Sequence, residues 1–261
     1  MSVNADWLIP DWPAPANVHA VCSTRAGGVS MAPFESLNLG DHVGDDPLAV
    51  AANRATLQQS LAAKPVFLSQ VHGTQVLRLS DATRDGTAAD GCLTTQPGVA
   101  CTIMVADCLP VLLTDTQGRL VAAVHAGWRS LAGQAGVGVL EGVYPDFAAL
   151  SPVHTEPKEA EVMAWLGPCI GPDAFEVGPE VRDAFMAHDP QAQSMFVPHV
   201  PGKWFANLQG LARLRLAALG VTRIYGNDGS AAWCTVSNPS RFFSYRRDGV
   251  TGRMAACIWR D

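Results

Sequence analysis

Hydrophobic residues of this chain gather in short blocks between polar turns, and the blocks indicate a mixture of strands and helices. Runs rich in Val, Ile, Leu and Phe that are bounded by Gly, Pro or Asp are typical of strands. They predict strands at 19–24, 66–71, 76–79, 100–105, 111–114, 120–125, 162–166, 223–225, 241–245 and 254–259. Several runs are apolar at nearly every position, which is typical of a sheet that is covered on both faces.

Four segments carry helix signals. At 47–62, Asp46 is placed to cap the helix and Pro47 to fill its first turn. Further helices are predicted at 130–143, 179–187 and 204–219, the last ending at Gly220. The segment 147–158 contains two prolines and is expected to be a surface loop.

Length and composition favour one domain over residues 1–261. The chain is 48% hydrophobic, and a chain of this size builds a core without covalent staples. It has no internal repeat and no low-complexity tract. We therefore predict an α+β fold, with mixed sheets at the centre and helices outside.

Charge and cysteine usage exclude several classes of protein. The net charge is −6, so the chain offers no basic stripe to nucleic acid. Seven cysteines with no CxxC pair argue against a disulfide framework and a zinc ribbon, and suit free thiols in a reducing compartment. The N-terminus lacks signal-peptide features, and the longest apolar stretch, 99–113, is too short to span a bilayer. We expect a cytoplasmic protein without a membrane partner.

Three predicted strands lead into side chains that can bind a metal: His72, Cys108 and His125. Two imidazoles and one thiolate are a ligand set that zinc accepts at catalytic sites, with the fourth position left open. Taken singly, each residue is more often structural. Together, and with Gly73 and Gly127 allowing close backbone approach, they favour a metal site.

Other motifs suggest contacts to a ligand. Arg25 precedes the pair Gly27-Gly28, whose backbone N–H groups can face an anion, although such a pair is usually just a turn. Gln70 shares a strand face with His72. Phe175 follows a stiff Gly-Pro loop and can stack on a planar ligand or fill the core. Arg246 lies in a segment that reads equally well as a solvated turn.

The motifs STRAGGVS, SLNLG, HVGDDP, SQVHG, ADCLP, HAGWR, GPCIGP, FEVG and FFSYRR occur in this order between residues 19 and 259. This set resembles the purine nucleoside phosphorylase family of the YfiH type, formerly called laccase-domain or polyphenol oxidase proteins. The resemblance implies a YfiH-like mixed β-sandwich with helices on both outer faces, in α/β/β/α layers. It also implies a Zn²⁺ ion held by His72, Cys108 and His125.

The resemblance further implies phosphorolysis of adenosine, inosine and S-methyl-5′-thioadenosine, and deamination of adenosine. Purine nucleosides and phosphate would be the small-molecule partners. We expect contacts to them from Arg25, Asn38, Gln70, Asp90, Arg129, Phe175 and Arg246. The HxE…PCxxC pattern of ordinary zinc base deaminases is absent, so the proton carrier must come from elsewhere, and Asp107 or Asp90 is the hypothesis.

Three alternatives stay open at this point. Cys108 can be a nucleophile with His72 or His125 as its base, which makes a hydrolase or amidase. Some members of the family are tied to peptidoglycan editing, so such an enzyme would act on muropeptide precursors. A multicopper oxidase is poorly supported, because the chain has no HxH pair. A non-enzymatic binding protein is the third class, and turnover of adenosine would argue against it.

Overall fold

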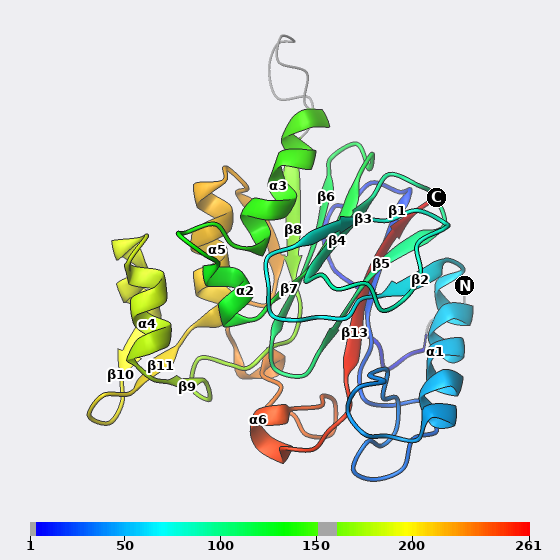
Figure 1. Cartoon of the computed structure of the whole chain (residues 1–261), viewed down its shortest axis with the longest axis horizontal. Helices are drawn as coiled ribbons and strands as arrows, with labels where there is room; N and C mark the ends of the chain where they lie inside the picture. Colours follow the sequence, from blue (N-terminus) through cyan, green and yellow to red (C-terminus); the bar gives the residue numbers. More distant parts are fainter. Residues whose placement is uncertain (1–3, 151–160) are drawn as a thin grey trace.

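The computed structural model describes residues 4–150 and 161–261 as two stacked β-sheets with helices on both outer faces (Figure 1). One sheet contains β3 (Val76–Arg78), β4 (Gly91–Thr94), β6 (Leu109–Asp115), β7 (Val121–Ala126), β8 (Val162–Leu166) and β12 (Arg223–Gly226). The other contains β1 (Val18–Cys22), β2 (Lys64–Phe67), β5 (Val99–Val105) and β13 (Met254–Arg260). The strand orders are β12-β8-β6-β7-β4-β3 and β1-β13-β5-β2.

Helices complete the outer layers. The helix α1 (Pro47–Leu61) contacts β2 of the four-stranded sheet, and α3 (Val139–Leu150) contacts β4 and β7 of the six-stranded sheet. Strands β5 and β7 contact each other across the interior, so the two sheets face one another. This arrangement confirms the predicted mixed β-sandwich with α/β/β/α layers, while the extent of the domain, 1–261, stays a prediction.

Strand β5 shows why its sequence is apolar throughout. Ile103 and Val105 belong to the cluster between the two sheets, whereas Ala100 and Met104 belong to the cluster under α1. Both faces of the strand are therefore covered. Burial of each large aliphatic side chain stabilises the fold by roughly 1.5–3 kcal/mol.

A third sheet and several short helices surround one end of the sandwich. The sheet consists of β9 (Glu176–Val177), β10 (Phe196–Pro198) and β11 (Trp204–Ala206), in the order β10-β11-β9. The remaining helices are α2 (Trp128–Ala132), α4 (Pro179–Met186), α5 (Leu208–Ala218), α6 (Tyr245–Asp248) and two 3₁₀ turns at Pro190–Met195 and Ala231–Trp233. None of the helices in the described ranges has the length and apolar character needed to cross a membrane.

Three of the predicted elements differ from the structure. The helix at 130–143 is two helices, because Gly133 and Gly136 take φ values of +68° and +78° that end one helix before the other begins. Residues 204–206 pair as β11, so the helix predicted at 204–219 begins only at Leu208. The strand predicted at 241–245 is absent, since the Ser244 hydroxyl caps α6 by accepting the N–H of Arg247.

The predicted loop at 147–158 is wrong at its start, where residues 147–150 belong to α3. Its remainder lies outside the described residues. The strands β4, β9 and β10 were not predicted, since each is short and none carries a clear apolar alternation. The other predicted strands are present, with ends that shift by a few residues.

Candidate metal centre and binding cavity

His72, Cys108 and His125 converge at one end of the sandwich. His72 lies in the loop after β2, Cys108 ends the tight connection from β5 to β6, and His125 lies near the end of β7. Strands β6 and β7 pair antiparallel and place Pro110 opposite His125, so Cys108 is brought close to the imidazole. The topology of the sheets therefore assembles residues that are far apart in the sequence.

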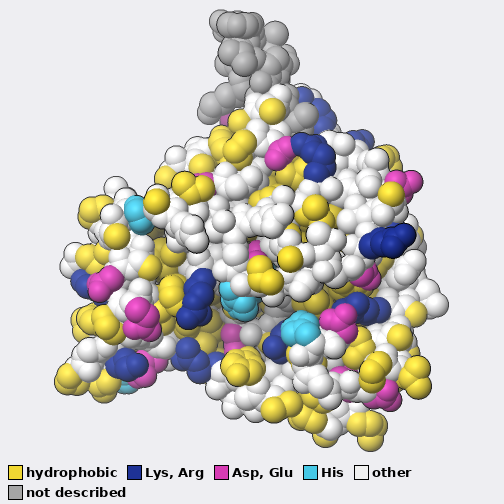
Figure 2. Space-filling model, viewed as in Figure 1, with side chains coloured by type: hydrophobic (Ala, Val, Ile, Leu, Met, Phe, Trp, Pro, Cys, Tyr) yellow, Lys and Arg dark blue, Asp and Glu magenta, His cyan; other side chains and the backbone are white. Residues whose placement is uncertain are grey.

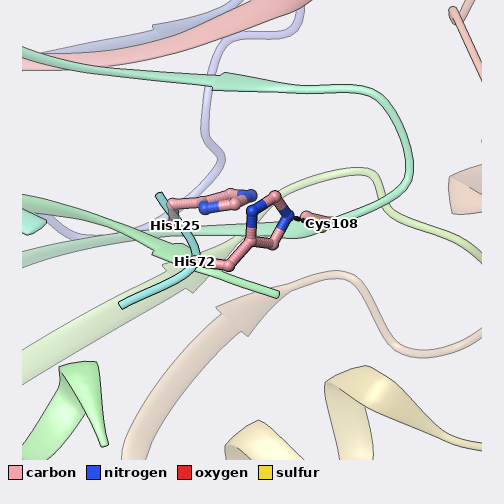
Figure 3. Close-up of side chains that lie close together, drawn as sticks. All are labelled: His72, Cys108 and His125. Atoms are coloured by element: carbon pink, nitrogen blue, oxygen red, sulfur yellow. Dashed lines mark hydrogen bonds between the residues drawn. The ribbon is translucent and has the colours of Figure 1, made fainter. Parts of the chain in front are cut away.

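The three side chains point toward one another (Figure 3). Their ligand atoms all lie within 4.8 Å of one another. The Sγ atom of Cys108 lies 3.9 Å from Nε2 of His72, and the two imidazole rings have centroids 4.8 Å apart. In the described part of the chain, this is the one group of three or more His, Cys, Asp or Glu side chains with such spacing.

Gly127 permits this close approach. A Cβ atom at this position would lie 3.0 Å from Sγ of Cys108 and 3.2 Å from Cδ2 of His72. Such contacts are tighter than nine in ten real Cβ contacts, so a larger residue would require these side chains to shift. Gly73 is different, because a Cβ there would make only ordinary contacts of 3.5 Å.

Asp90 stands directly behind the cluster. Its carboxylate is fully buried and accepts hydrogen bonds from three backbone N–H groups, at 3.1, 2.9 and 2.6 Å, from Val71, His72 and Gly73. It also lies 2.8 Å from Nδ1 of His125. Burial opposes its charge, but these donors outweigh burial and hold the pKa of Asp90 below its usual value.

Cys108 and His125 each favour the charged form of the other. Burial opposes charge on both groups, but the neighbouring His125 and the hydrogen bonds from both imidazoles lower the pKa of Cys108 to about 6. The thiolate and the Asp90 carboxylate in turn raise the pKa of His125 to about 9. The thiolate, which is the form that binds metal ions, is therefore favoured at neutral pH.

The cluster lines a cavity of about 530 Å³, a size that suits a small organic ligand. Figure 2 shows histidine side chains, and side chains coloured as Lys or Arg, around a hollow on this face of the molecule. The apolar part of the lining includes Met104, Trp128, Ile170, Phe175, Leu208 and Tyr245. The basic part consists of Arg129, Arg246, Arg253 and the imidazoles of His42, His72 and His125.

Three arginines of the cavity form no ion pair with any carboxylate of residues 4–150 and 161–261. Arg129 lies over the Trp128 ring at 4.3 Å, Arg246 donates to the carbonyl of Glu176 at 3.1 Å, and Arg253 donates to the carbonyl of Thr251 at 3.0 Å. The arginine–carboxylate pairs of the described residues all involve other arginines. The cavity therefore carries positive charge that a bound anion can neutralise.

Of the residues predicted to contact substrate, four line the cavity: Gln70, Arg129, Phe175 and Arg246. The amide of Gln70 already pairs with the backbone of Met104, donating at 2.8 Å and accepting at 2.7 Å. Asp107, the predicted proton carrier, also lines the cavity. Its two oxygens accept the hydroxyl of Thr235 and the backbone N–H of Arg246, both at 2.6 Å.

The other three, Arg25, Asn38 and Asp90, do not line the cavity. Arg25 donates to the carbonyls of Glu35 and Pro239 at 2.9 and 2.8 Å and stacks on the ring of Phe243. Its guanidinium therefore holds loops together. Asn38 and Asp90 are fully buried, and their side-chain groups bond to backbone atoms and to Asp45 or His125.

Sequence reasoning missed His42, Tyr245 and Arg253 as cavity residues. Arg253 is half-buried, and burial lowers its pKa while the facing Cys108 and Asp107 oppose that effect. These side chains come from three separate segments, so no local spacing connects them. The one usable signal was that two of them lie within or beside motifs already singled out, HVGDDP and FFSYRR.

Comparison with known proteins places this chain in a family. The model of the family described as multi-copper polyphenol oxidoreductase laccase matches residues 19–261, so the chain belongs to that family. The purine nucleoside phosphorylase PA4543 of Pseudomonas aeruginosa is 51% identical over 97% of this chain and 98% of its own. The purine nucleoside phosphorylase YfiH of Escherichia coli is 48% identical over the same shares.

Solved structures agree with the fold. The protein NMB0706 of Neisseria meningitidis superposes with a TM-score of 0.87 at 47% identity, covering 98% of this chain and 99% of that one. YlmD of Geobacillus stearothermophilus superposes with a TM-score of 0.78 at 31% identity, covering 94% and 92%. The relatives extend over nearly the full chain, so both the cluster and the cavity fall within the matched region.

Proposed function

We propose that this protein is a zinc-dependent purine nucleoside phosphorylase that cleaves adenosine, inosine and S-methyl-5′-thioadenosine and also deaminates adenosine. One observation carries the proposal: a His-His-Cys cluster opens into a cavity that joins aromatic and aliphatic walls to three guanidinium groups that form no ion pair with a carboxylate among the described residues. Such a lining suits a planar base at one side and phosphate at the other. The naming of the near full-length relatives supports it.

The donor set fits zinc. Two imidazole nitrogens and one thiolate leave one coordination position open, as at catalytic zinc sites. Several copper ions would need further clustered histidines, and the described residues hold a single ligand group. When bound, zinc supplies Lewis acidity that polarises the substrate atom placed against it.

In phosphorolysis, a phosphate oxygen bonds to C1′ of the ribose while the bond from C1′ to the base breaks. The electron pair leaves with the base, which takes up the proton that the phosphate gives up. We propose that Arg129, Arg246 and Arg253 bind phosphate and neutralise its charge. Phe175, over which Arg246 stacks at 5.6 Å, provides an aromatic wall for the base.

In deamination, water adds at C6 of adenine and ammonia leaves, so a group must carry protons between them. Asp107 is the better of the two predicted carriers, because its carboxylate lines the cavity and Asp90 is enclosed. An Asp107→Asn variant should lose deamination of adenosine and keep zinc. Retained deamination would remove Asp107 from this role.

The proposal is tested by metal content together with product analysis. Wild-type protein should hold about one zinc per chain, and Cys108→Ala should hold much less. Incubation with adenosine and phosphate should give adenine and ribose 1-phosphate, with inosine from the parallel deamination. Full zinc in Cys108→Ala would show that the ligand assignment is wrong.

A cysteine hydrolase acting on muropeptide precursors is the second candidate. It is favoured by the pairing of Cys108 with two histidines and by the lowered pKa of its thiol, which are features of an activated nucleophile. Labelling with iodoacetamide separates the two functions. A zinc-bound thiolate should alkylate slowly until a chelator removes the metal, whereas a nucleophile should react rapidly in the metallated protein and lose activity.

The other cysteines serve as internal controls in this labelling. All six are buried, and burial raises the pKa of Cys257 to about 12 and that of Cys22 still higher. Because all six thiols are enclosed, they should remain unlabelled in the native protein at pH near 8. We also propose a cytoplasmic location, since seven free cysteines suit a reducing compartment.

A further inference from the structure

Asp90 connects to both histidines of the cluster, by a different route to each. Its Oδ1 accepts the backbone N–H of His72 at 2.9 Å and lies 2.8 Å from Nδ1 of the His125 ring. Its Oδ2 accepts the N–H groups of Val71 and Gly73 at 3.1 and 2.6 Å. The carbonyl of Asp90 also accepts the backbone N–H of His125 at 2.7 Å.

Each contact fixes something that a metal ligand needs. A carboxylate facing Nδ1 of His125 holds the proton on that nitrogen. The lone pair of Nε2 is then free to bind a metal ion. His72 has a φ value of +58°, a conformation that residues other than glycine seldom adopt. The three consecutive N–H groups around it converge on the Asp90 carboxylate, so the turn that presents the His72 ring depends on that carboxylate.

We propose that Asp90 is a positioning residue that prepares His72 and His125 together for the metal, and that it has no contact with substrate. The inference rests on the proposed metal site but not on the proposed reaction. Asp90 is fully buried and does not line the cavity, which argues against the substrate contact that the sequence suggested. His125 is likewise buried, so solvent cannot replace Asp90 at its Nδ1.

An isosteric amide cannot perform this task. The carboxylate of Asp90 faces N–H groups on both oxygens, and asparagine has only one oxygen. If the amide oxygen faces His125, the NH₂ group faces the N–H groups of Val71 and Gly73, so these donors have no acceptor. If the amide turns over, the NH₂ group opposes His125 and favours the tautomer whose proton blocks Nε2. Either orientation disturbs one of the two histidines.

The test compares Asp90→Asn with Asp115→Asn. Asp115 is also a buried carboxylate, and it accepts two hydrogen bonds from Arg119, at 2.8 and 2.7 Å, at the other end of β6. Zinc affinity is measured by competition with a chromophoric chelator, and folding by thermal unfolding. Asp90→Asn should bind zinc about 10- to 100-fold more weakly than wild type, as found for other partners of ligating histidines. Asp115→Asn should lower stability and keep wild-type zinc affinity.

The tautomer of His125 provides a second measurement that needs no variant. In ¹⁵N-histidine-labelled wild-type protein loaded with zinc, the two-bond correlation spectrum should show His125 protonated at Nδ1 and ligating through Nε2. The opposite assignment would overturn the inference, even if Asp90→Asn does not fold. Unchanged zinc affinity in a folded Asp90→Asn variant would overturn it too. Wild-type protein that binds no zinc would refute both this inference and the metal site, whereas absent phosphorolysis would refute only the reaction.

Discussion

Gly127 packs directly against Cys108, and a methyl group at position 127 would lie 3.0 Å from the Sγ atom. The same methyl group would lie 3.2 Å from the His72 ring. We therefore expect Gly127→Ala to separate the ligands and to weaken zinc binding by about 10-fold or more. Chelator competition measures this effect.

Gly73→Ala is the matched control for that variant. Gly73 also adjoins a ligand histidine, yet a Cβ there would meet only Asp90 and Val71 at 3.5 Å, an ordinary contact distance. Its zinc affinity should stay close to that of wild type. An equal loss of zinc affinity in both variants would contradict this expectation. It would indicate that any added methyl group beside the histidines weakens zinc binding, whether or not it contacts Cys108.

Substitution of Arg253, but not of Arg25, should change the KM for phosphate in nucleoside cleavage. Removing a charge-assisted hydrogen bond costs roughly 1.5–3 kcal/mol, or about 10- to 100-fold in binding. Arg253→Ala should therefore raise the KM for phosphate by about that factor, because its guanidinium lines the cavity.

Arg25→Ala should leave the KM for phosphate unchanged and lower the melting temperature, since Arg25 bonds to the carbonyls of Glu35 and Pro239. Steady-state kinetics over a range of phosphate concentrations tests both variants. A raised KM for phosphate in Arg25→Ala would restore the role that the sequence suggested for it.

Asn38 should matter for stability. Its side chain accepts the N–H groups of Gly40 and Arg253 at 2.9 Å each, and donates to the carboxylate of Asp45 at 2.8 Å. Asn38→Ala leaves the N–H groups of Gly40 and Arg253 without this acceptor, and each enclosed N–H group that loses its partner costs roughly 1–3 kcal/mol. Urea unfolding should show a lower midpoint with an unchanged slope, and a wild-type midpoint would contradict the assignment.

The layered fold could be predicted because the apolar pattern of its strands indicates which faces are buried. Strand β5 is apolar on both faces, since it packs against the other sheet on one side and α1 on the other. The break between α2 and α3 could not be predicted in the same way. Gly133 and Gly136 are compatible with a helix at some cost, and only the contacts of the loop decide that they end it.

The metal cluster could be proposed from the sequence because each of its residues ends or follows an apolar run that predicts a strand. The arginines that line the cavity beside the cluster were harder to identify. Arg25 precedes a glycine pair, which is typical of anion sites, but its guanidinium is taken by carbonyls from distant loops. Arg253 lies in a segment that reads equally well as a solvated turn, and it comes close to Cys108 and Asp107 through the pairing of β13 with β5.

The most direct test of the central claim is phosphate-dependent cleavage of inosine by protein of defined metal content. Zinc-loaded protein should convert inosine and phosphate into hypoxanthine and ribose 1-phosphate, and omission of phosphate should abolish the reaction. Removal of zinc should stop it and added zinc should restore it, with no restoration in Cys108→Ala. Equal turnover by metal-free and zinc-loaded protein, or hypoxanthine released without phosphate, would contradict the account.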